Sequence, residues 1–314
     1  MTAVPALVLT AGLATRLRPL SFVRAKAALP VAGEPIVHRI LRSLKSAGVG
    51  EAVLNLHHLP HTLTSLVGDG GELGMRVRYS WETPVLGSAG GPKRAIPLLG
   101  SSTFLIVNGD TLTDADVNGA IAEHRASGAL VTMMVVPNTE PEKYSGLAVD
   151  RDGNVTGFVQ RGAATQSFHF IGLQVAEAGA FARVPANRPF EVRDLYLDLI
   201  AERLGSVRAM RCAAEFFDIG TPADYLQTSL RIGDREGRDS TAPGARIAAG
   251  ARVERSILWD DVVIEPGARL RQCIVTDRVT VPGDTSWHGV TIRNASGELA
   301  PGERRVDGLA IASL

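Results

Sequence analysis

The sequence predicts an α/β protein: a doubly wound, Rossmann-like domain followed by a small left-handed β-helix. Through the first two thirds, short runs rich in Val, Ile and Leu alternate with amphipathic stretches. A polar stretch containing Gly and Pro follows, and after it a Gly-Ala-Arg-aliphatic motif occurs three times. With 314 residues the chain is longer than a domain with a single hydrophobic core usually is. We therefore expect two domains, at 1–232 and 243–314, joined by a linker at 233–242.

Five apolar segments are predicted to be buried strands, because they are apolar on both faces instead of alternating with polar residues. Runs of this kind are typical of a mostly parallel sheet covered by helices. The segments are 6–10, 52–56, 77–81, 104–108 and 129–136.

Helices are predicted between and after these strands. The segment 35–48 places five aliphatic residues on one helical face, starts with a proline suited to the first turn and ends at Gly48. The same reasoning predicts helices at 114–128, 192–205 and 221–233. Alternating strands and helices imply right-handed crossovers and a doubly wound sheet.

The pattern changes between Leu147 and Val175. Two strand-like stretches there are separated by turn residues, including an Asp-Gly pair. Such strand-turn-strand signals predict an antiparallel insertion in the sheet.

The β-helix prediction depends on the repeated motif, which ends at Ile247, Val253 and Leu270. The first two copies are six residues apart, and a six-residue period with one aliphatic residue per rung is typical of a left-handed β-helix. Only a few turns fit between Pro243 and Asn294. We therefore expect a small cap that could serve as a surface for homo-oligomer assembly, with a tail from Ser296 onward that carries no signal.

Composition excludes several classes of function. Lys+Arg and Asp+Glu are both 33, and this neutral balance argues against a nucleic-acid or acidic-membrane binder. The two cysteines, Cys212 and Cys273, have no metal-ligand spacing and suggest a reducing compartment. No apolar run is long enough to span a bilayer, and no signal-peptide pattern opens the chain. We expect a cytoplasmic protein.

The segment from Leu9 to Gly33 is rich in cations and free of carboxylates. It contains Arg16, Arg18, Arg24 and Lys26, and follows a predicted strand through a small-residue turn. In α/β proteins ligands bind at the carboxyl ends of strands, where backbone N–H groups of such turns point at anions. Exposed loops normally mix charges. The segment is therefore predicted to bind phosphates.

Two aspartates follow apolar segments elsewhere in the chain. Asp110 comes directly after the strand at 104–108, so we expect it at the same sheet edge as Gly12. Asp218 follows Phe216 and Phe217, and Thr221 before a proline already supplies a helix cap there. Since Mg²⁺ is held by one or two carboxylates plus substrate phosphates, the pair is predicted to bind Mg²⁺.

At this point the chain resembles the sugar nucleotidyltransferases, closest to the bacterial mannose-1-phosphate guanylyltransferase type with a C-terminal left-handed β-helix. The family pattern L-A-A-G-x-G-T-R-L-x-P-L-T appears as LTAGLATRLRPLS, and L-P-V-x-G-x-P as LPVAGEP. The family's L-G-T-A-G appears as LGSAG, while its N-G-D and D-I-G-T-P are present unchanged. The resemblance implies a nucleoside triphosphate and a sugar 1-phosphate as substrates.

The resemblance also implies roles for individual residues. Arg16 and Lys26 would be catalytic and would contact the β- and γ-phosphates, with Asp110 and Asp218 as the metal ligands. The residues implied for the nucleoside are Ala11, Gly12, Leu13, Glu82, Gly87 and Ser88. The residues implied for the sugar phosphate are Asn108, Gly146, Gln160, Arg161 and Gly172.

The chemistry implied by the family is in-line attack of a sugar 1-phosphate oxygen on the α-phosphorus, which expels pyrophosphate. The attacking phosphate is already anionic, so alignment and charge neutralisation suffice. A carboxylate at Glu82 offers two acceptors to the two donors on the guanine edge, which favours GTP. Mannose- or heptose-type sugars are favoured. Uridylyl- and thymidylyltransferases, including those acting on N-acetylmuramate 1-phosphate, remain alternatives.

The chain departs from the family pattern at four places. Ala14 replaces a glycine of the turn, Ala25 and Ala27 replace the prolines beside Lys26, and Gln160-Arg161 replaces Glu-Lys. These departures keep open a catalytically silent, regulatory sugar-nucleotide-binding homologue. An acyltransferase using the β-helix is disfavoured, because so few turns cannot form a trimeric cleft.

Overall fold

A computed structural model of the protein describes residues 4–314. Contacts divide the chain into two compact units. Unit 1 comprises the residues up to Gly12 together with Ile40–Pro60 and Thr64–Phe217; unit 2 comprises Leu13–Arg39, His61–Leu63 and Asp218–Leu314. The units do not coincide with the domains expected from sequence, since the segment 13–39 groups with the C-terminal part of the chain.

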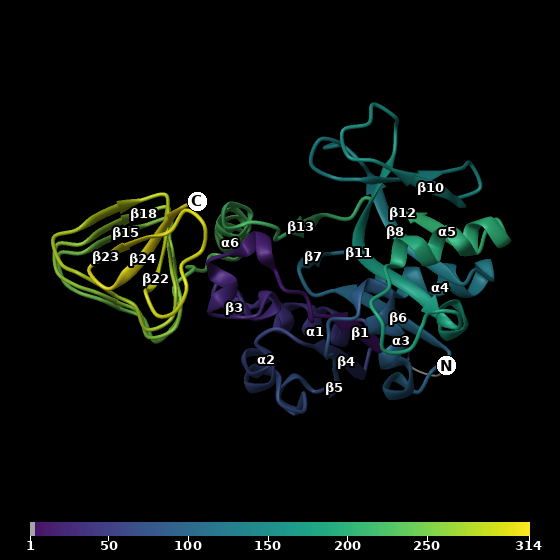
Figure 1. Ribbon diagram of the computed structural model, residues 1–314, viewed down its shortest axis with the longest axis horizontal. Helices are drawn as coiled ribbons and strands as arrows, with labels where there is room; N and C mark the ends of the chain where they lie inside the picture. Colours follow the sequence, from purple (N-terminus) through teal and green to yellow (C-terminus); the bar gives the residue numbers. More distant parts are fainter. Residues whose placement is uncertain (1–3) are drawn as a thin grey trace. The chain divides into compact units, whose positions relative to one another are not determined.

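Unit 1 is built on a nine-stranded mixed sheet (Figure 1). Four neighbouring strands run parallel in the order β6-β1-β4-β5, and β11 joins β6 antiparallel. Its strands are β1 (Ala6–Leu9), β4 (Glu51–Leu56), β5 (Arg76–Trp81), β6 (Thr103–Asn108), β8 (Val131–Pro137), β9 (Gly146–Val149), β10 (Val155–Val159), β11 (Phe168–Glu177) and β12 (Val207–Arg211). All five predicted strands are present, but β5 at the end of the sheet order is not buried as expected, since Trp81 is 54% exposed.

The antiparallel insertion predicted between Leu147 and Val175 is also confirmed. β9 pairs antiparallel with β10, and β11 pairs antiparallel with both β6 and β8. The strand predicted at 129–136 is β8, and it lies outside the group of four parallel strands. β8 pairs antiparallel with β11 on one side and parallel with β12 on the other.

The helices of the chain are α1 (Ile36–Ser46), α2 (Pro60–Val67), α3 (Gly87–Leu99), α4 (Val117–Ser127), α5 (Val192–Glu202) and α6 (Pro222–Glu236). The four predicted helices are present as α1, α4, α5 and α6. Thr221 caps α6 in a capping box with Asp224, and Pro222 occupies the first turn. α2 and α3 were not predicted.

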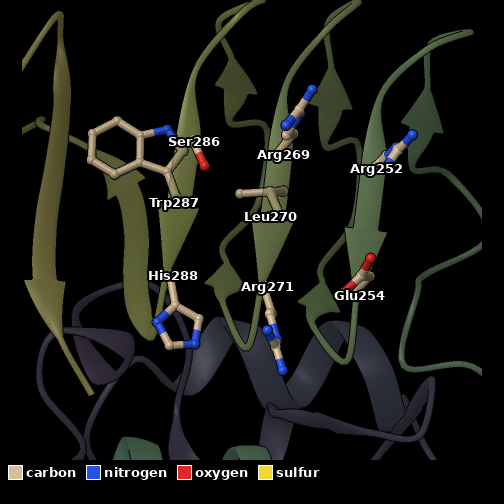
Figure 2. A pocket seen from close by; sticks show the side chains of 8 residues that line it. All are labelled: Arg252, Glu254, Arg269, Leu270, Arg271, Ser286, Trp287 and His288. Atoms are coloured by element: carbon tan, nitrogen blue, oxygen red, sulfur yellow. The ribbon is translucent and has the colours of Figure 1, made fainter.

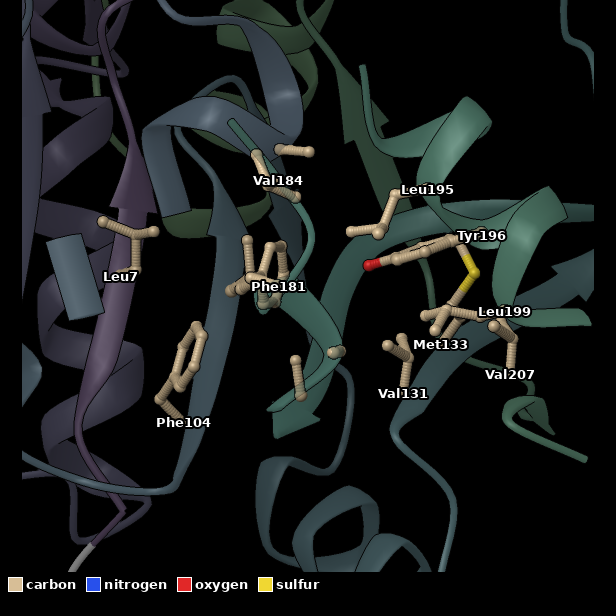
Figure 3. Packing of buried hydrophobic residues seen from close by; sticks show 14 of the residues in the cluster. Leu7, Phe104, Val131, Met133, Phe181, Val184, Leu195, Tyr196, Leu199 and Val207 are labelled. Carbon is tan, nitrogen blue, oxygen red and sulfur yellow. The ribbon is translucent and has the colours of Figure 1, made fainter. Parts of the chain in front are cut away.

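The core of unit 1 lies between the sheet and its helices. Figure 3 shows side chains of one buried cluster, with Leu7 and Phe104 at the left, Phe181 near the centre, and Tyr196 with Met133 at the right. The rings of Phe104 and Phe181 lie 5.9 Å apart in a tilted pair. Burial raises the pKa of the Tyr196 hydroxyl, which donates a hydrogen bond to Gln174 Oε1 at 2.9 Å. This packing makes the sheet a rigid support for residues at its edge.

The C-terminal part of unit 2 is a left-handed β-helix (Figure 1). Three parallel ladders pair residues 17 positions apart, for example Arg252 with Arg269 and Arg269 with Ser286. The strands are β14 (Arg246–Ile247), β15 (Arg252–Glu254), β16 (Ile257–Leu258), β17 (Val263–Ile264), β18 (Arg269–Arg271), β19 (Ile274–Val275), β20 (Thr280–Val281), β21 (Ser286–His288) and β22 (Val290–Asn294). Aliphatic side chains stack inside the coil, as the repeat predicts.

The tail beyond Ser296, which carried no sequence signal, closes the β-helix. β24 (Leu309–Ser313) pairs antiparallel with β22, and β23 (Arg304–Val306) pairs with β24. Leu309 and Ile311 join the apolar interior of the coil. Within the described residues, no helix is long and apolar enough to cross a membrane.

The N-terminal segment of unit 2 packs on α6. It contains the short 3₁₀ turns at Thr15–Leu17, Leu20–Phe22 and Lys26–Ala28, followed by β2 (Pro30–Val31) and β3 (Glu34–Pro35). The amide of Ala32 donates to Ser229 Oγ at 2.9 Å, and Tyr225 Oη on α6 donates to Pro30 O at 2.5 Å. The cation-rich segment is thus bound by the C-terminal part of the chain.

Candidate functional site

The first part of the site lies at one edge of the unit 1 sheet. β1 and β6 are in register up to Leu9 and Asn108, and Gly109 N donates to Leu9 O at 3.0 Å. The turn beginning at Ala11 and the aspartate at 110 therefore leave the sheet at the same edge, as the sequence predicts. A Cβ at Gly109 would approach Leu9 O to 2.5 Å, so only glycine allows this contact.

Asp110 belongs to a cluster that includes two of the predicted sugar-phosphate residues. Gly172, at φ +79° in the bulge of β11, lies so close that an added Cβ would be 3.1 Å from Asn108 Cβ and 3.0 Å from Thr111 Oγ1. Thr111 Oγ1 in turn donates to Asp110 Oδ1 at 3.2 Å. The structure thus brings Asn108, Asp110 and Gly172 together.

A buried network of hydrogen bonds, which the sequence did not predict, lies at this edge of the sheet. Asn55, at the end of β4, accepts from Thr10 N at 2.6 Å and donates to Glu82 Oε1 at 2.8 Å. Glu82 Oε2 accepts from Leu86 N at 2.8 Å. Both Glu82 oxygens therefore have partners inside the protein, and the residue is 3% exposed. Glu82 thus links the end of β4 to the residue before α3. That Glu82 binds the nucleotide base stays a prediction.

Replacing Asn55 by alanine is expected to lower the free energy of unfolding by about 1–3 kcal/mol. The change removes the partner of a buried carboxylate oxygen and of the Thr10 amide. Urea denaturation of the two proteins measures the difference. Asn118→Ala on the exposed face of α4 is the control. An Asn55 variant as stable as this control would contradict the network's importance.

Gly87 and Ser88 lie at the N-terminus of α3, where they contact the residues preceding α5. Gly87 has φ +75°, and a Cβ there would be 2.7 Å from Glu191 Oε1. Ser88 Oγ donates to Glu191 Oε2 at 2.6 Å and accepts from Val192 N at 2.8 Å. The hydroxyl that was predicted to face the nucleoside thus links α3 to α5.

The other predicted sugar-phosphate residues lie on the antiparallel insertion. Gly146 opens β9, and a Cβ there would clash with Ser167 Oγ at 2.2 Å. Gln160 and Arg161 follow β10 and are exposed. Their role in the site stays a prediction.

An aromatic cluster beside Gly146 was also missed. His169 on β11 packs between Tyr144 and Phe216, with ring centroids 4.2 and 4.8 Å away. Its Nδ1 is buried without a hydrogen-bond partner in the described residues. Burial is the main cause that lowers the pKa of His169, while a hydrogen bond to Ser145 opposes it. Burial therefore disfavours the protonated form of the imidazole.

This histidine predicts a pH dependence of stability. Because its pKa is lower in the folded than in the unfolded protein, stability is complete above about pH 6.5 and is lost as the pH falls. The melting temperature should therefore decline on acidification less in His169→Phe, which keeps a ring without a titrating group, than in the wild-type protein. Identical pH profiles for the two proteins would contradict the assignment.

A further group of predicted residues lies in unit 2. An added Cβ at Gly220 would be 3.4 Å from Arg16 Nη1 and 3.6 Å from Asp218 Oδ2. Two predicted residues, one cationic and one metal-binding, therefore border the same glycine. Ala14 keeps the left-handed conformation (φ 47°, ψ 45°) that the family glycine would adopt easily. The turn is retained despite the substitution.

Lys26 begins a short 3₁₀ turn between two buried alanines. Ala25 has φ −58° and ψ 146°, a conformation that proline also adopts. Its amide donates to Thr62 Oγ1 at 3.1 Å, a bond that the family proline could not make. The backbone before Lys26 is thus held by a hydrogen bond in place of a proline ring.

Arg18 and Arg24 differ from the expectation for the cation-rich segment. Arg18 lies over the Phe22 ring at 5.2 Å, and Arg24 pairs with Asp260 and Asp277 of the β-helix. The phosphate-binding prediction for the segment named only Arg16 and Lys26, and Arg24 instead binds carboxylates. A cation in sequence proximity to a phosphate site can equally bind carboxylates that come from far along the chain.

The donor set fits Mg²⁺ without forming a closed metal site. Asp110 and Asp218 supply hard carboxylate oxygens and both are partly exposed. Within residues 4–314, no group of three or more His, Cys, Asp or Glu could hold a metal ion. Carboxylates of this kind bind a divalent ion together with substrate phosphates.

A separate cavity of about 390 Å³ lies on the β-helix (Figure 2). Arg269 and Arg271 of β18 border it, with Arg252 on the strand in register before and His288 on the strand after. None of the predicted site residues lines it, and its arginines are exposed.

Comparisons with known proteins extend these observations. The nucleotidyl transferase family profile matches residues 5–235, and a GlmU-like C-terminal hexapeptide profile matches residues 238–291. Mannose-1-phosphate guanylyltransferase of Mycobacterium tuberculosis is 29% identical over 291 residues, covering 88% of this chain and 81% of the relative.

A second relative and a solved structure of similar fold also match. UTP–glucose-1-phosphate uridylyltransferase of Synechocystis is 27% identical, over 83% of this chain and 72% of the relative. The crystal structure of HddC from Yersinia pseudotuberculosis complexed with GMP-PN matches with a TM-score of 0.63 at 23% identity. It covers 73% of this chain and 99% of that one.

Proposed function

The chain belongs to the nucleotidyl transferase family, and from this premise we propose that it transfers a nucleotidyl group from a nucleoside triphosphate to a sugar 1-phosphate. The observation that carries the proposal is the shared sheet edge at which β1 and β6 end. Asp110 and the turn after Thr10 both follow strands that end at this edge, and the carboxyl ends of strands are where α/β sheets bind ligands, which supports the proposal.

The proposed chemistry is one displacement at phosphorus. An oxygen of the sugar 1-phosphate attacks the α-phosphorus in line, the bond to the β-phosphate oxygen breaks, and pyrophosphate leaves with the electron pair. Arg16 and Lys26 orient the β- and γ-phosphates and neutralise the charge that develops on them. Asp110 and Asp218 would hold a divalent ion, which we propose is Mg²⁺; when bound, it supplies further neutralisation of phosphate charge.

Substrate positioning is the second task of the site. Ala11, Gly12 and Leu13 form the turn proposed to lie under the nucleoside, and a Cβ at Gly12 would meet no described atom within 4 Å. Room at this glycine supports close approach of a ligand to the backbone. The cluster of Asn108 and Gly172 beside Asp110 supports a sugar-phosphate site there.

We propose GTP as the nucleotide and a mannose- or heptose-type sugar 1-phosphate as the acceptor. The support is the similarity to the guanylyltransferase of M. tuberculosis over most of both chains. The similarity to the Synechocystis uridylyltransferase keeps UTP as the alternative. Glu82 lends no separate support, since both of its oxygens have protein partners.

The test is pyrophosphate release with Mg²⁺, measured for GTP, UTP, dTTP, ATP and CTP against a panel of sugar 1-phosphates. Mannose, glucose, heptose and N-acetylated sugar 1-phosphates belong in the panel, and chelation of the metal is the control. Release with GTP and one sugar confirms the proposal. Tight nucleotide binding without release for any pair would instead indicate the regulatory homologue.

A further inference from the structure

Arg24 lies two residues before Lys26, outside the family motif, yet its side chain is 11% exposed. The guanidinium binds Asp277 with two bonds, Nε to Oδ2 at 2.8 Å and Nη2 to Oδ1 at 2.6 Å. Nη2 also donates to Asp260 Oδ2 at 2.5 Å. Both aspartates follow strands of the β-helix, more than 230 residues along the chain.

Trp259 of the β-helix also connects, through Tyr225, to the residues that follow Lys26. Trp259, fully buried beside Asp260, lies under the Arg24 guanidinium at 5.2 Å. Trp259 Nε1 donates to Tyr225 Oη at 3.0 Å, and Tyr225 Oη donates to Pro30 O at 2.5 Å. Lys26 is therefore flanked by two attachments that meet at one tryptophan.

The geometry of the Arg24–Asp277 pair is suited to fixing the position of the segment around Lys26. A bidentate arginine–carboxylate pair fixes direction as well as distance, which a lysine ammonium would not. Burial by itself lowers the pKa of Arg24, but the hydrogen bonds and charges of Asp277 and Asp260 raise it overall. Nε and Nη2 of the cation are thus bound by carboxylates of the β-helix.

We propose that Arg24 is a positioning residue, and that its pairing with Asp277 and Asp260 lets the β-helix hold Lys26 in place for catalysis. This rests on the function proposed above. The β-helix then contributes to the reaction without touching a substrate. A small displacement of Lys26 would weaken its contact with charge that develops in the transition state more than ground-state binding.

The central variant is Asp277→Asn, which removes one charge and leaves the side-chain shape. We expect kcat for pyrophosphate release to fall on the order of 10–100-fold, while KM for the sugar 1-phosphate stays unchanged. Arg24→Lys, which keeps the charge and loses the bidentate geometry, should retain more activity than Arg24→Met. This graded rescue would not be expected if Arg24 only filled space.

The matched control is Asp234→Asn. Asp234 on α6 makes an exposed ion pair with Arg255 of the β-helix at 3.4 Å, away from Arg24 and its two aspartate partners in the hydrogen-bond pattern. It should leave kcat unchanged. If Asp277→Asn keeps the wild-type kcat, or if both asparagine variants lose activity equally, the proposal is wrong.

Amide hydrogen exchange of residues 18–31 gives a readout that needs no turnover. Exchange should accelerate in Asp277→Asn and Arg24→Met but not in Asp234→Asn. If the wild-type protein releases no pyrophosphate with any substrate pair, the proposed function fails, and exchange still decides whether Arg24 anchors the segment. Unchanged exchange in every variant would overturn the anchor itself.

Discussion

Replacing Asp110 by asparagine is expected to lower the rate of Mg²⁺-dependent pyrophosphate release on the order of 10²–10³-fold. Asp110 follows β6 directly at the sheet edge beside the turn after Thr10, and it accepts a hydrogen bond from Thr111. Asparagine keeps the shape of the side chain and that hydrogen bond. The loss would therefore be one of negative charge toward a metal ion.

Steady-state rates measured over a range of Mg²⁺ concentrations provide the test. If Asp110 holds the ion, the variant should need more Mg²⁺ to reach its own maximum as well as being slower. Asp116→Asn is a matched control, because Asp116 only caps α4 by accepting from Gly119 N, which asparagine also does. A variant at position 110 with the wild-type rate and Mg²⁺ dependence would refute the metal role.

The largest effect on stability is expected from Glu303→Gln in unit 2. Glu303 is completely buried, and Arg293 on β22 is 4% exposed. Arg293 binds Glu303 with two bonds, Nε to Oε1 at 2.8 Å and Nη2 to Oε2 at 2.6 Å. Removing one member leaves an uncompensated buried charge, which costs about 3–5 kcal/mol.

The consequence should extend beyond the tail, because Arg293 also lies over the ring of Phe22 at 5.2 Å. Unfolding of unit 2 can be followed by fluorescence of Trp259 and Trp287 in a Trp81→Phe background, since Trp81 is the exposed tryptophan of unit 1. Glu202→Gln, at an exposed pair with Arg183, is the control and should change little.

A double change separates charge from packing in this pair. Arg293→Met combined with Glu303→Leu removes both charges, so the double variant should be more stable than Glu303→Gln alone. If the single variant is as stable as the wild-type protein, the buried pair does not hold the end of the β-helix. A double variant less stable than the single one would show that the hydrogen bonds to the tail carbonyls dominate.

Hydrophobic pattern was sufficient to predict most of the framework. Continuous apolar runs marked the strands of unit 1, and the Gly-Ala-Arg repeat marked the β-helix, because both depend on local periodicity. α3 was missed because its sequence contains three glycines and two prolines. Those glycines are needed by packing: a Cβ at Gly91 would be 2.7 Å from Glu82 Oε1. Tertiary contacts thus overrode a poor helix propensity.

The motifs also placed the ends of β1 and β6 correctly, since parallel strands end at a common edge. The sequence could not show which polar side chains would have hydrogen-bond partners inside the protein. Glu82 and Ser88 looked available for a nucleoside, but their partners, Asn55 and Glu191, come from other elements.

Arg24 shows the same limit most clearly. From sequence it is one of four cations in a carboxylate-free segment that is predicted to bind phosphates. Its carboxylates come from Asp260 and Asp277, which folding brings beside it. Local pattern determines elements because backbone hydrogen bonds and side-chain periodicity are short-range. The partner of a buried charge is determined by contacts between distant segments, and only the folded chain contains them.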